Sequence, residues 1–355
     1  MSVYIILFCY TALTGYSINK MKNNHNKKFG KFLLFILMAV LVLVAGFRGV
    51  GSDYGNYVRV YENITKLTLE DLWISIIKFD EPGFKLLCFV SKLIYDSPTT
   101  MFVLSSLLTI APCIWLIYKE DVDFGLAIIL YLLLVWVGTF GAVRQCLAGA
   151  MVFCGYHHLK KRNFFKYLLW VVIGASFHIT CLIMIPLYFI MSRKVSFKGV
   201  LLIIVSAIVL RYSYDFLFEL IGAVKDKELG DYSYLTTEVN VFRILVAFAP
   251  IILFLFIPKK SKVEVAGKVT QLDLAMNAIL INAALMFATM GSAYLARVGI
   301  YLSVFFPIAI PEIIKGYDKK SYAIIVLVMT VLYLAYCLYG VNAQGLEYIT
   351  IFQRN

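Results

Sequence analysis

The sequence predicts an all-α, polytopic membrane protein: about twelve transmembrane helices (roughly 10–13) forming one integral membrane domain, residues 1–355. Of the 355 residues, 61% are hydrophobic and 15% are charged, against roughly 25% charged residues in a soluble domain. Apolar runs long enough to cross a bilayer as helices recur along the whole chain. No polar stretch between them is long enough to form a separate soluble domain.

The predicted spans follow the apolar runs. The first does not resemble a signal peptide, because its positive charges follow the apolar core, and we expect a retained helix. Residues 164–191 are too long for one helix. A break near 174–178 would turn them into a hairpin of two short spans and place His178 at its outer tip. The twelve spans are 2–18, 32–47, 98–118, 124–140, 142–159, 164–177, 179–191, 198–216, 241–257, 272–290, 298–314 and 321–339.

Charge sets the predicted orientation of these spans. Most of the 33 lysines and arginines fall in or beside the short loops on one side of the membrane. The positive-inside rule makes that side cytoplasmic and places both termini outside. The net charge of +12 is therefore a topology signal, and we expect no nucleic-acid partner. These loops are 19–31, 119–123, 160–163, 192–197, 258–271 and 315–320.

Two longer loops, residues 48–97 and 215–240, are predicted on the outer side. In the first, Gly83–Tyr95 has apolar residues at helical spacing, interrupted by Lys85, Ser91 and Lys92. This pattern is typical of a helix lying in the membrane interface. The second loop is rich in charge and tyrosine, and such a loop could cover a cavity or contact a sugar.

Four arginines mark the predicted outer ends of spans that are distant in the sequence: Arg48, Arg144, Arg243 and Arg297. A charged group at membrane depth costs about 2.5–3.5 kcal/mol even on a lenient insertion scale. The guanidinium group keeps its charge when desolvated, and its forked donors match phosphate oxygens. We therefore expect the four to gather around a lipid-linked phosphate or diphosphate. The alternative is a set of separate interfacial anchors.

Other polar residues accompany these arginines. Asp53, Tyr54 and Tyr57 follow Arg48 in a glycine-rich loop, and carboxylates and aromatic rings are typical of sugar recognition. Asp53 could instead simply pair with Arg48. Glu81 precedes a Pro-Gly pair and could bind sugar, fix the arginines or only cap the next helix. His178 could take a proton from a hydroxyl or be an ordinary core histidine.

Cysteine and histidine give no sign of a metal site. The seven cysteines include no CxxC pair, and most fall inside apolar runs, as expected of small buried hydrophobic residues. The four histidines have no metal-ligand spacing, and His157 and His158 adjoin a basic loop. We therefore expect no metal and no other cofactor.

Several motifs, in this order, resemble the EpsG group of Wzy-type polysaccharide polymerases. The likeness is best over residues 1–190, and beyond them it rests mainly on hydropathy, Arg243 and Arg297. Its motifs are Arg48 with Gly51–Ser52–Asp53–Tyr54 and Tyr57, Glu81–Pro82–Gly83–Phe84, Val143–Arg144–Gln145–Cys146–Leu147–Ala148, and Lys161–Arg162–Asn163–Phe164 with Ala175–Ser176–Phe177–His178.

The resemblance implies a GT-C-like glycosyltransferase of the bacterial inner membrane with a periplasmic active site and periplasmic termini. Such enzymes join oligosaccharide repeat units carried on undecaprenyl diphosphate, which serves as the substrate carrier, into O-antigen or exopolysaccharide. Related enzymes are thought to invert the anomeric centre without a metal. A flippase and a chain-length regulator are possible partners beside the glycan substrates and the bilayer.

The resulting hypothesis gives each candidate residue a role. The four arginines bind the donor diphosphate and stabilise the charge on it as the glycosidic bond breaks, and Arg144 is also a candidate catalytic residue. His178 acts on the acceptor hydroxyl, with Asp53 as the alternative base. The candidate sugar-binding residues are Tyr54, Tyr57, Glu81 and Gln145. The alternatives are a flippase or transporter of lipid-linked saccharides, an O-acyltransferase, and the related O-antigen ligase.

Overall fold

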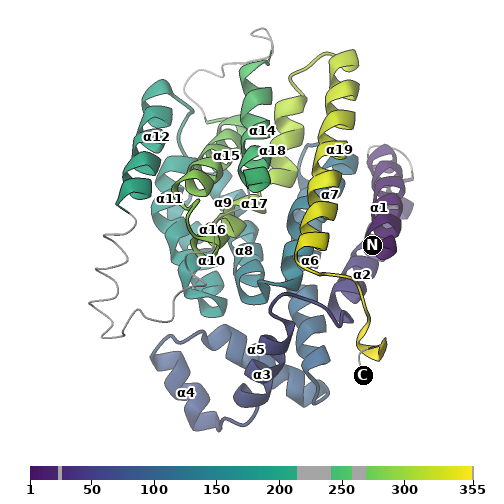
Figure 1. Cartoon of the computed structure of the whole chain (residues 1–355), viewed down its shortest axis with the longest axis vertical. Coiled ribbons are helices and arrows are strands. Elements are labelled where there is room, and N and C mark those ends of the chain that lie inside the picture. Colours follow the sequence, from purple (N-terminus) through teal and green to yellow (C-terminus); the bar gives the residue numbers. More distant parts are fainter. Residues whose placement is uncertain (23–25, 214–240, 258–268, 354–355) are drawn as a thin grey trace.

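The computed structural model describes residues 1–22, 26–213, 241–257 and 269–353, and within these ranges the chain is helical throughout, with no β-strand. Figure 1 shows long helices side by side and a group of short helices at one end, which is the predicted outer end. The all-α prediction is confirmed. The predicted loop 215–240 lies outside the described residues.

The first half of the chain contributes three long helices, three short helices between the second and third of them, and four further apolar segments. Its helices are α1 (Ser2–Met21), α2 (Lys27–Gly46), α3 (Tyr54–Ile64), α4 (Leu69–Ile77), α5 (Pro82–Ile94), α6 (Pro98–Lys119), α7 (Phe124–Tyr131), η1 (Leu132–Trp136), η2 (Val137–Phe140), α8 (Val143–Cys154), α9 (Tyr156–Lys160), α10 (Phe164–Phe177), η3 (Ile179–Ile183) and α11 (Met184–Met191).

The second half is built from longer helices around one segment that is broken into short pieces. Its helices are α12 (Phe197–Tyr212), α14 (Val241–Leu255), α15 (Gln271–Ala288), α16 (Ala293–Ala296), η7 (Arg297–Gly299), α17 (Ile300–Ser303), α18 (Phe306–Ile314), α19 (Lys319–Ala343) and η8 (Ile351–Gln353).

Every predicted span coincides with a helical segment, but many of these segments are short. Five helices of the described residues are long and apolar enough to cross a membrane: α1, α2, α6, α15 and α19. A sixth crossing is formed if the segments Arg297–Ser303 and Phe306–Ile314, bent by 54° to one another, count as one span. The chain is thus a multi-pass membrane protein, while the count of twelve and the GT-C-like architecture remain predictions.

The predicted break in residues 164–191 is confirmed. α10 ends at Phe177, His178 has an extended backbone (φ −156°, ψ 117°), and the 3-10 helix η3 begins at Ile179. The chain then returns beside α10, where the Cys181 thiol contacts the Val171 carbonyl oxygen at 3.3 Å. His178 is therefore the residue at which α10 ends and the backbone becomes extended.

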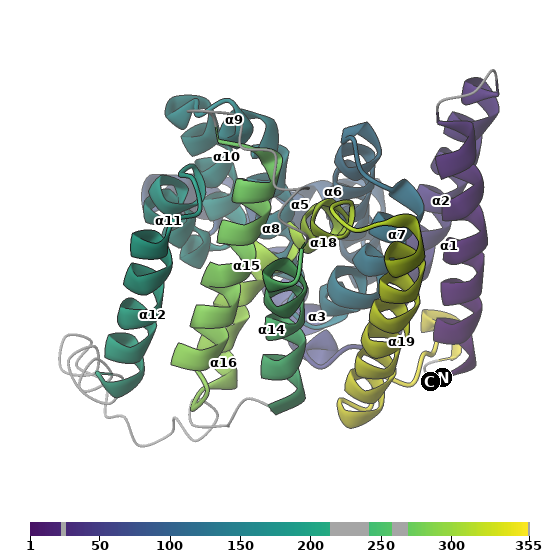
Figure 2. The same cartoon turned by 90° about the horizontal axis from the view of Figure 1, so that it is seen from above.

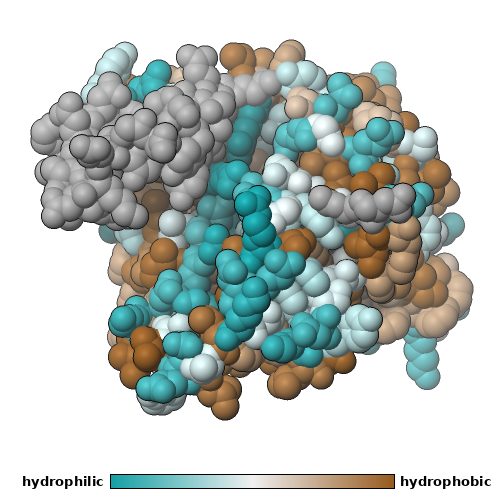
Figure 3. All heavy atoms as spheres, turned by 60° about the horizontal axis from the view of Figure 1, so that its bottom comes forward, coloured by the Kyte–Doolittle hydropathy of each residue, from teal (hydrophilic) through white to brown (hydrophobic). Residues whose placement is uncertain are grey.

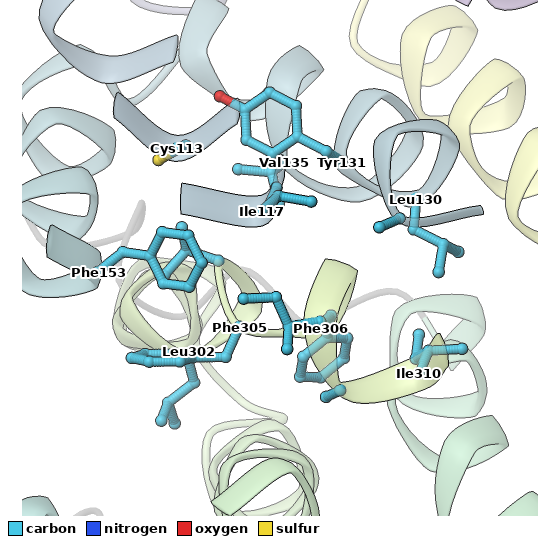
Figure 4. Close-up of a cluster of buried hydrophobic side chains, with 14 of the residues drawn as sticks. Cys113, Ile117, Leu130, Tyr131, Val135, Phe153, Leu302, Phe305, Phe306 and Ile310 are labelled. Carbon is cyan, nitrogen blue, oxygen red and sulfur yellow. The ribbon is translucent and has the colours of Figure 1, made fainter. Parts of the chain in front are cut away.

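Tight aromatic and aliphatic packing joins the two halves of the protein. Figure 4 shows Phe153 of α8 close to Phe305, at the bend between α17 and α18, while the Tyr131 hydroxyl of α7 points toward Cys113. The rings of Phe153 and Phe305 meet edge to face with centroids 5.3 Å apart. This contact fixes the bent segment that begins at Arg297 against the helix that begins beside Arg144.

The two chain ends lie together, as Figure 2 shows. The Tyr4 hydroxyl donates to the Leu346 carbonyl oxygen at 2.8 Å, and the Gly49 amide donates to the Ile349 carbonyl oxygen at 2.8 Å. The start of α1, the end of α2 and the segment after α19 therefore share one end of the bundle. This arrangement fits an even number of crossings, and the identity of that side as periplasmic stays a prediction.

Arg48 is buried at this junction, with 1% of its surface exposed. Its guanidinium group donates to the carbonyl oxygen of Ala45 and, at 3.2 Å, to that of Thr139. The group also lies 4.7 Å and 5.0 Å from the ring centroids of Phe102 and Phe140. These contacts tie the end of α2 to α6 and η2, which favours a structural role for Arg48.

We expect Arg48→Ala to lower the free energy of unfolding by at least about 2 kcal/mol, because it removes a large buried side chain and two hydrogen-bond donors. Arg59→Ala is the matched control, since Arg59 is exposed on α3. The apparent melting temperature in detergent measures the difference. A variant that melts like the wild type but has lost activity would contradict the structural role and support diphosphate binding by Arg48.

Candidate functional site

A chain of polar contacts links Arg144, Glu81, His178 and Gln145 at the outer end of the bundle. One Glu81 carboxylate oxygen accepts a hydrogen bond from Arg144 Nη1, and the other lies 2.5 Å from His178 Nδ1. On the far edge of the imidazole ring, Nε2 lies 3.2 Å from the Gln145 side-chain nitrogen. Three separate elements, α5, α8 and the break after α10, supply these four residues.

The carboxylate determines which ring nitrogen of His178 carries the proton. An ionised carboxylate can only accept hydrogen bonds, so Nδ1 donates to Glu81. In the neutral ring, Nε2 then has a free lone pair, which accepts from the Gln145 amide in this structure. His178 is therefore held in the tautomer that can take a proton at Nε2.

Burial alone would raise the pKa of Glu81, but the hydrogen bond with His178 and the positive charge of Arg144 outweigh it and hold this pKa below its usual value. The Glu81 side chain is 15% exposed and that of His178 is 14% exposed. Glu81 is therefore ionised at neutral pH. A carboxylate that is shielded from water in this way orients the imidazole ring more firmly than a fully solvated carboxylate would.

The backbone of Glu81 is unusual. Its φ of 46° and ψ of 49° place it in the left-handed region, which residues other than glycine seldom adopt. The side chain does not cap α5, although Glu81 occupies the N-cap position. This conformation instead turns the carboxylate toward Arg144 and His178. Left-handed backbone at a non-glycine residue often marks a functional site.

A close helix contact sets the distance between Glu81 and His178. Gly83, near the start of α5, lies against Ser176, near the end of α10. A Cβ atom on Gly83 would come within 2.3 Å of the Ser176 hydroxyl oxygen and 3.1 Å of its Cβ. Only glycine lets these two helices approach so closely. The Gly83 in the Glu-Pro-Gly motif thus positions the residue that precedes the proline.

Arg144 is further held by aromatic residues of the outer helices. Its guanidinium carbon lies 5.8 Å from the ring centroid of Tyr57 and 5.8 Å from that of Phe84. Its backbone amide donates to the Tyr57 hydroxyl at 3.3 Å. The Arg144 side chain remains 34% exposed. Part of its charge therefore faces outward, where an anion can reach it.

Arg243 and Arg297 form a second group, near the start of α3. Arg297 Nη1 is 3.4 Å from an Asp53 carboxylate oxygen, so Asp53 pairs with Arg297 and not with its sequence neighbour Arg48. Arg243 reaches toward the same segment, where it donates to the Ala296 carbonyl oxygen at 3.5 Å. Helices α14 and α3 and the bent segment from α16 to α17 therefore meet at this point.

The two arginine groups are connected through short stretches of chain. Asp53 immediately precedes α3, which carries Tyr57 against Arg144. On the opposite side, the hydroxyl groups of Thr180 and Tyr301 lie 2.7 Å apart and join the His178 turn to the helix after Arg297. Figure 3 shows this end of the molecule, with hydrophilic side chains along a band through the middle of the face.

The structure places the predicted site residues in two groups of contacts, one around Glu81 and one around Asp53. Three of the four arginines belong to the linked groups, while Arg48 lies buried behind Phe102 and donates to backbone carbonyls. Tyr54 stacks on Phe102 with ring centroids 4.9 Å apart, and Tyr57 is only 7% exposed. Packing therefore accounts for both tyrosines, and sugar binding by Tyr54, Tyr57, Glu81 and Gln145 remains a prediction.

Sequence reasoning missed Thr180, Tyr301 and the positioning role of Gly83. Hydroxyl residues in apolar segments are too common to be singled out, so Thr180 and Tyr301 offered no signal. Glu81 was considered for sugar binding, for fixing the arginines or for capping. Its contact with Arg144 agrees with the second of these, whereas its contact with His178 was not predicted. The Pro-Gly pair after Glu81 was the one usable signal, because glycine beside a charged residue often marks close backbone approach.

The comparisons with known proteins bear on this arrangement. The model of the EpsG family matches residues 31–350, which is nearly the whole chain. No curated protein and no solved structure matches the chain significantly. The matched range includes both arginine groups, Glu81 and His178. The chain therefore belongs to the EpsG family, a family of Wzy-like polysaccharide polymerases.

Proposed function

We propose that this protein is a membrane glycosyltransferase that polymerises undecaprenyl-diphosphate-linked oligosaccharide repeat units into O-antigen or exopolysaccharide at the periplasmic face of the inner membrane. Family membership supports the polymerase class. The observation that carries the mechanism is the contact chain from Arg144 through Glu81 to His178. It places a proton acceptor and a cation within one short network.

In the proposed reaction, His178 Nε2 takes the proton from a hydroxyl group on the terminal sugar of the incoming unit. The hydroxyl oxygen then bonds to the anomeric carbon of the growing chain. The bond from that carbon to the diphosphate oxygen breaks, and its electron pair leaves with the lipid diphosphate. Attack from the face opposite the leaving group inverts the anomeric centre.

Gln145 occupies the position that the acceptor hydroxyl needs. The Gln145 side-chain nitrogen donates to His178 Nε2. The side-chain oxygen is buried and has no hydrogen-bond partner among the described residues, and only 9% of the whole residue is exposed. A buried amide with an unused acceptor is suited to bind a sugar hydroxyl. We place the acceptor hydroxyl between His178 and Gln145, with the Gln145 amide turning so that its oxygen accepts from a neighbouring hydroxyl of the same sugar.

The arginines supply the charge for the leaving group. Arg144 and Arg297 are partly exposed, at 34% and 38% of the side chain, and Arg243 adjoins Arg297 through Ala296. Negative charge grows on the diphosphate as the glycosidic bond breaks, and one well-placed donor is worth roughly 3–4 kcal/mol to such a step. The proposed reaction uses these fixed cations and no metal or other cofactor.

His178 is preferred over Asp53 as the base because of their partners. Asp53 lies 3.4 Å from Arg297, so its carboxylate is engaged in an ion pair with that arginine. His178 is oriented by a carboxylate that stabilises the imidazolium formed on proton transfer. Asp53 instead holds Arg297 in place. The flippase and the chain-length regulator remain proposed partners.

We expect His178→Ala to slow elongation about 100-fold or more, the scale of general acid–base catalysis. Glu81→Gln should slow it about 10-fold or more, since the amide cannot stabilise the imidazolium. Elongation is measured as the glycan ladder made by purified protein from lipid-linked repeat units. His157→Ala and Glu62→Gln are the matched controls, and both should keep wild-type rates. Near-normal ladders from His178→Ala in well-folded protein would overturn the assignment.

The same assay separates the rival functions. A polymerase makes a ladder of glycans, a ligase adds the glycan once to a lipid A core, and a flippase moves the lipid without forming a new glycosidic bond. A chelator added to the purified enzyme should leave the ladder unchanged. Loss of activity with the chelator, restored by a divalent cation, would contradict the metal-independent mechanism.

Acid should weaken the network through Glu81. Its pKa in the folded protein is lowered, so the contacts with Arg144 and His178 stabilise the fold above the usual pKa of the carboxyl group. That contribution is lost as the pH falls through the lowered value. The apparent melting temperature of the wild type should therefore fall more steeply than that of Glu81→Gln between about pH 6 and pH 3. Parallel curves for the two proteins would show that the network adds no stability.

A further inference from the structure

Helix α4 exposes a stripe of large apolar side chains along one face. Leu69, Trp73, Ile76 and Ile77 recur at helical spacing and are 78%, 62%, 47% and 69% exposed. The opposite face packs inward through Leu72 and Ser75. A capping box between Thr68 and Asp71 fixes the start of this short helix. The sequence analysis did not predict α4.

The next helix, α5, repeats this pattern. Leu86, Val90, Leu93 and Ile94 are 55%, 40%, 85% and 63% exposed along one face. Its inner face is formed by Phe84, Leu87, Cys88 and Ser91, all buried. Helix α5 is therefore apolar on two sides, of which the protein covers one. A helix with two apolar faces needs a second apolar partner.

Three features identify the bilayer as that partner. Helix α5 packs against α6 and α10, whose own exposed faces are apolar through residues such as Leu107 and Leu169. The apolar surface of the hairpin is thus attached to faces that lie in lipid. Trp73 and Tyr95 are both largely exposed, as is typical of side chains at the headgroup level.

Charge supports the same partner. Lys66 and Lys78 are exposed residues at the two ends of α4, whereas the ammonium group of Lys92 donates to the Thr65 carbonyl oxygen at 2.8 Å. Long basic side chains can extend from an inserted helix to the phosphate groups of lipids. Figure 3 shows hydrophobic side chains interrupting the hydrophilic surface near the margins of this face.

We propose that the α4–α5 hairpin docks on the outer leaflet of the bilayer, with both apolar stripes buried among the lipid headgroups and upper acyl chains. The hairpin carries Glu81 at its turn, where Phe79 and Glu81 both have positive φ. Anchoring the hairpin therefore also holds the carboxylate that orients His178. The docking does not depend on the proposed reaction, whereas its effect on His178 rests on it.

Fluorescence of Trp73 tests the docking in nanodiscs of phosphatidylcholine and phosphatidylglycerol. The contribution of Trp73 is the difference between the wild type and Trp73→Phe. We expect lipids brominated near the top of the acyl chains to quench it at least about 2-fold. Aqueous iodide should quench it several-fold less than it quenches free indole. Iodide quenching equal to that of free indole, with no effect of brominated lipid, would overturn the proposal.

A second variant separates docking from its consequence. Leu69→Ser/Ile77→Ser should abolish the quenching by brominated lipid, while the surface control Glu70→Gln leaves it unchanged. If this double variant binds lipid like the wild type, or if it only dissociates a dimer of the protein, the docking proposal fails. Loss of docking in the double variant, with elongation at the wild-type rate, would contradict only the positioning of Glu81. The quenching result would still support docking even if the protein proved not to be a polymerase.

Discussion

The position of the Glu81 carboxylate is the constraint on which the candidate site depends. One of its oxygens contacts Arg144 and the other contacts His178, so a single residue joins the start of α8 to the break after α10. Neither partner could be placed by its own helix alone, because both lie where regular structure begins or ends. The left-handed backbone of Glu81 and the close contact at Gly83 fix the carboxylate between them.

Interrupted membrane segments supply the remaining residues of the site. His178 is the extended residue between α10 and η3, and Arg297 begins a short 3-10 turn ahead of a segment bent by 54°. Irregular backbone at membrane depth is stable only where protein or a water-filled cavity surrounds it. The Thr180–Tyr301 contact brings the two interruptions together. The polar site and the broken helices are thus consequences of one arrangement.

Hydropathy was enough to predict the helical segments and the break near His178, because both follow from local composition and from the length of a membrane crossing. The pairing of charges did not follow. Asp53 is five residues from Arg48 but pairs with Arg297, which is 244 residues away. Such long-range pairs depend on how the helices pack, and this packing cannot be derived from a single sequence. The exposed stripe on α4 was missed because nine residues are too few for a clear span pattern.

Arg48 and Arg144 show why residue type and membrane depth do not determine a role. Arg48 follows the end of α2 and Arg144 lies in the first turn of α8, and both guanidinium groups lie over aromatic rings. Around Arg48 the available acceptors are the backbone carbonyl oxygens of Ala45 and Thr139. The Arg48 side chain is therefore fully buried, and its hydrogen bonds join helices. Around Arg144 the acceptor is a carboxylate that also binds a histidine, and a third of the side chain stays exposed. What distinguishes a structural arginine from a reactive one is therefore the chemistry of the acceptor that packing brings to it.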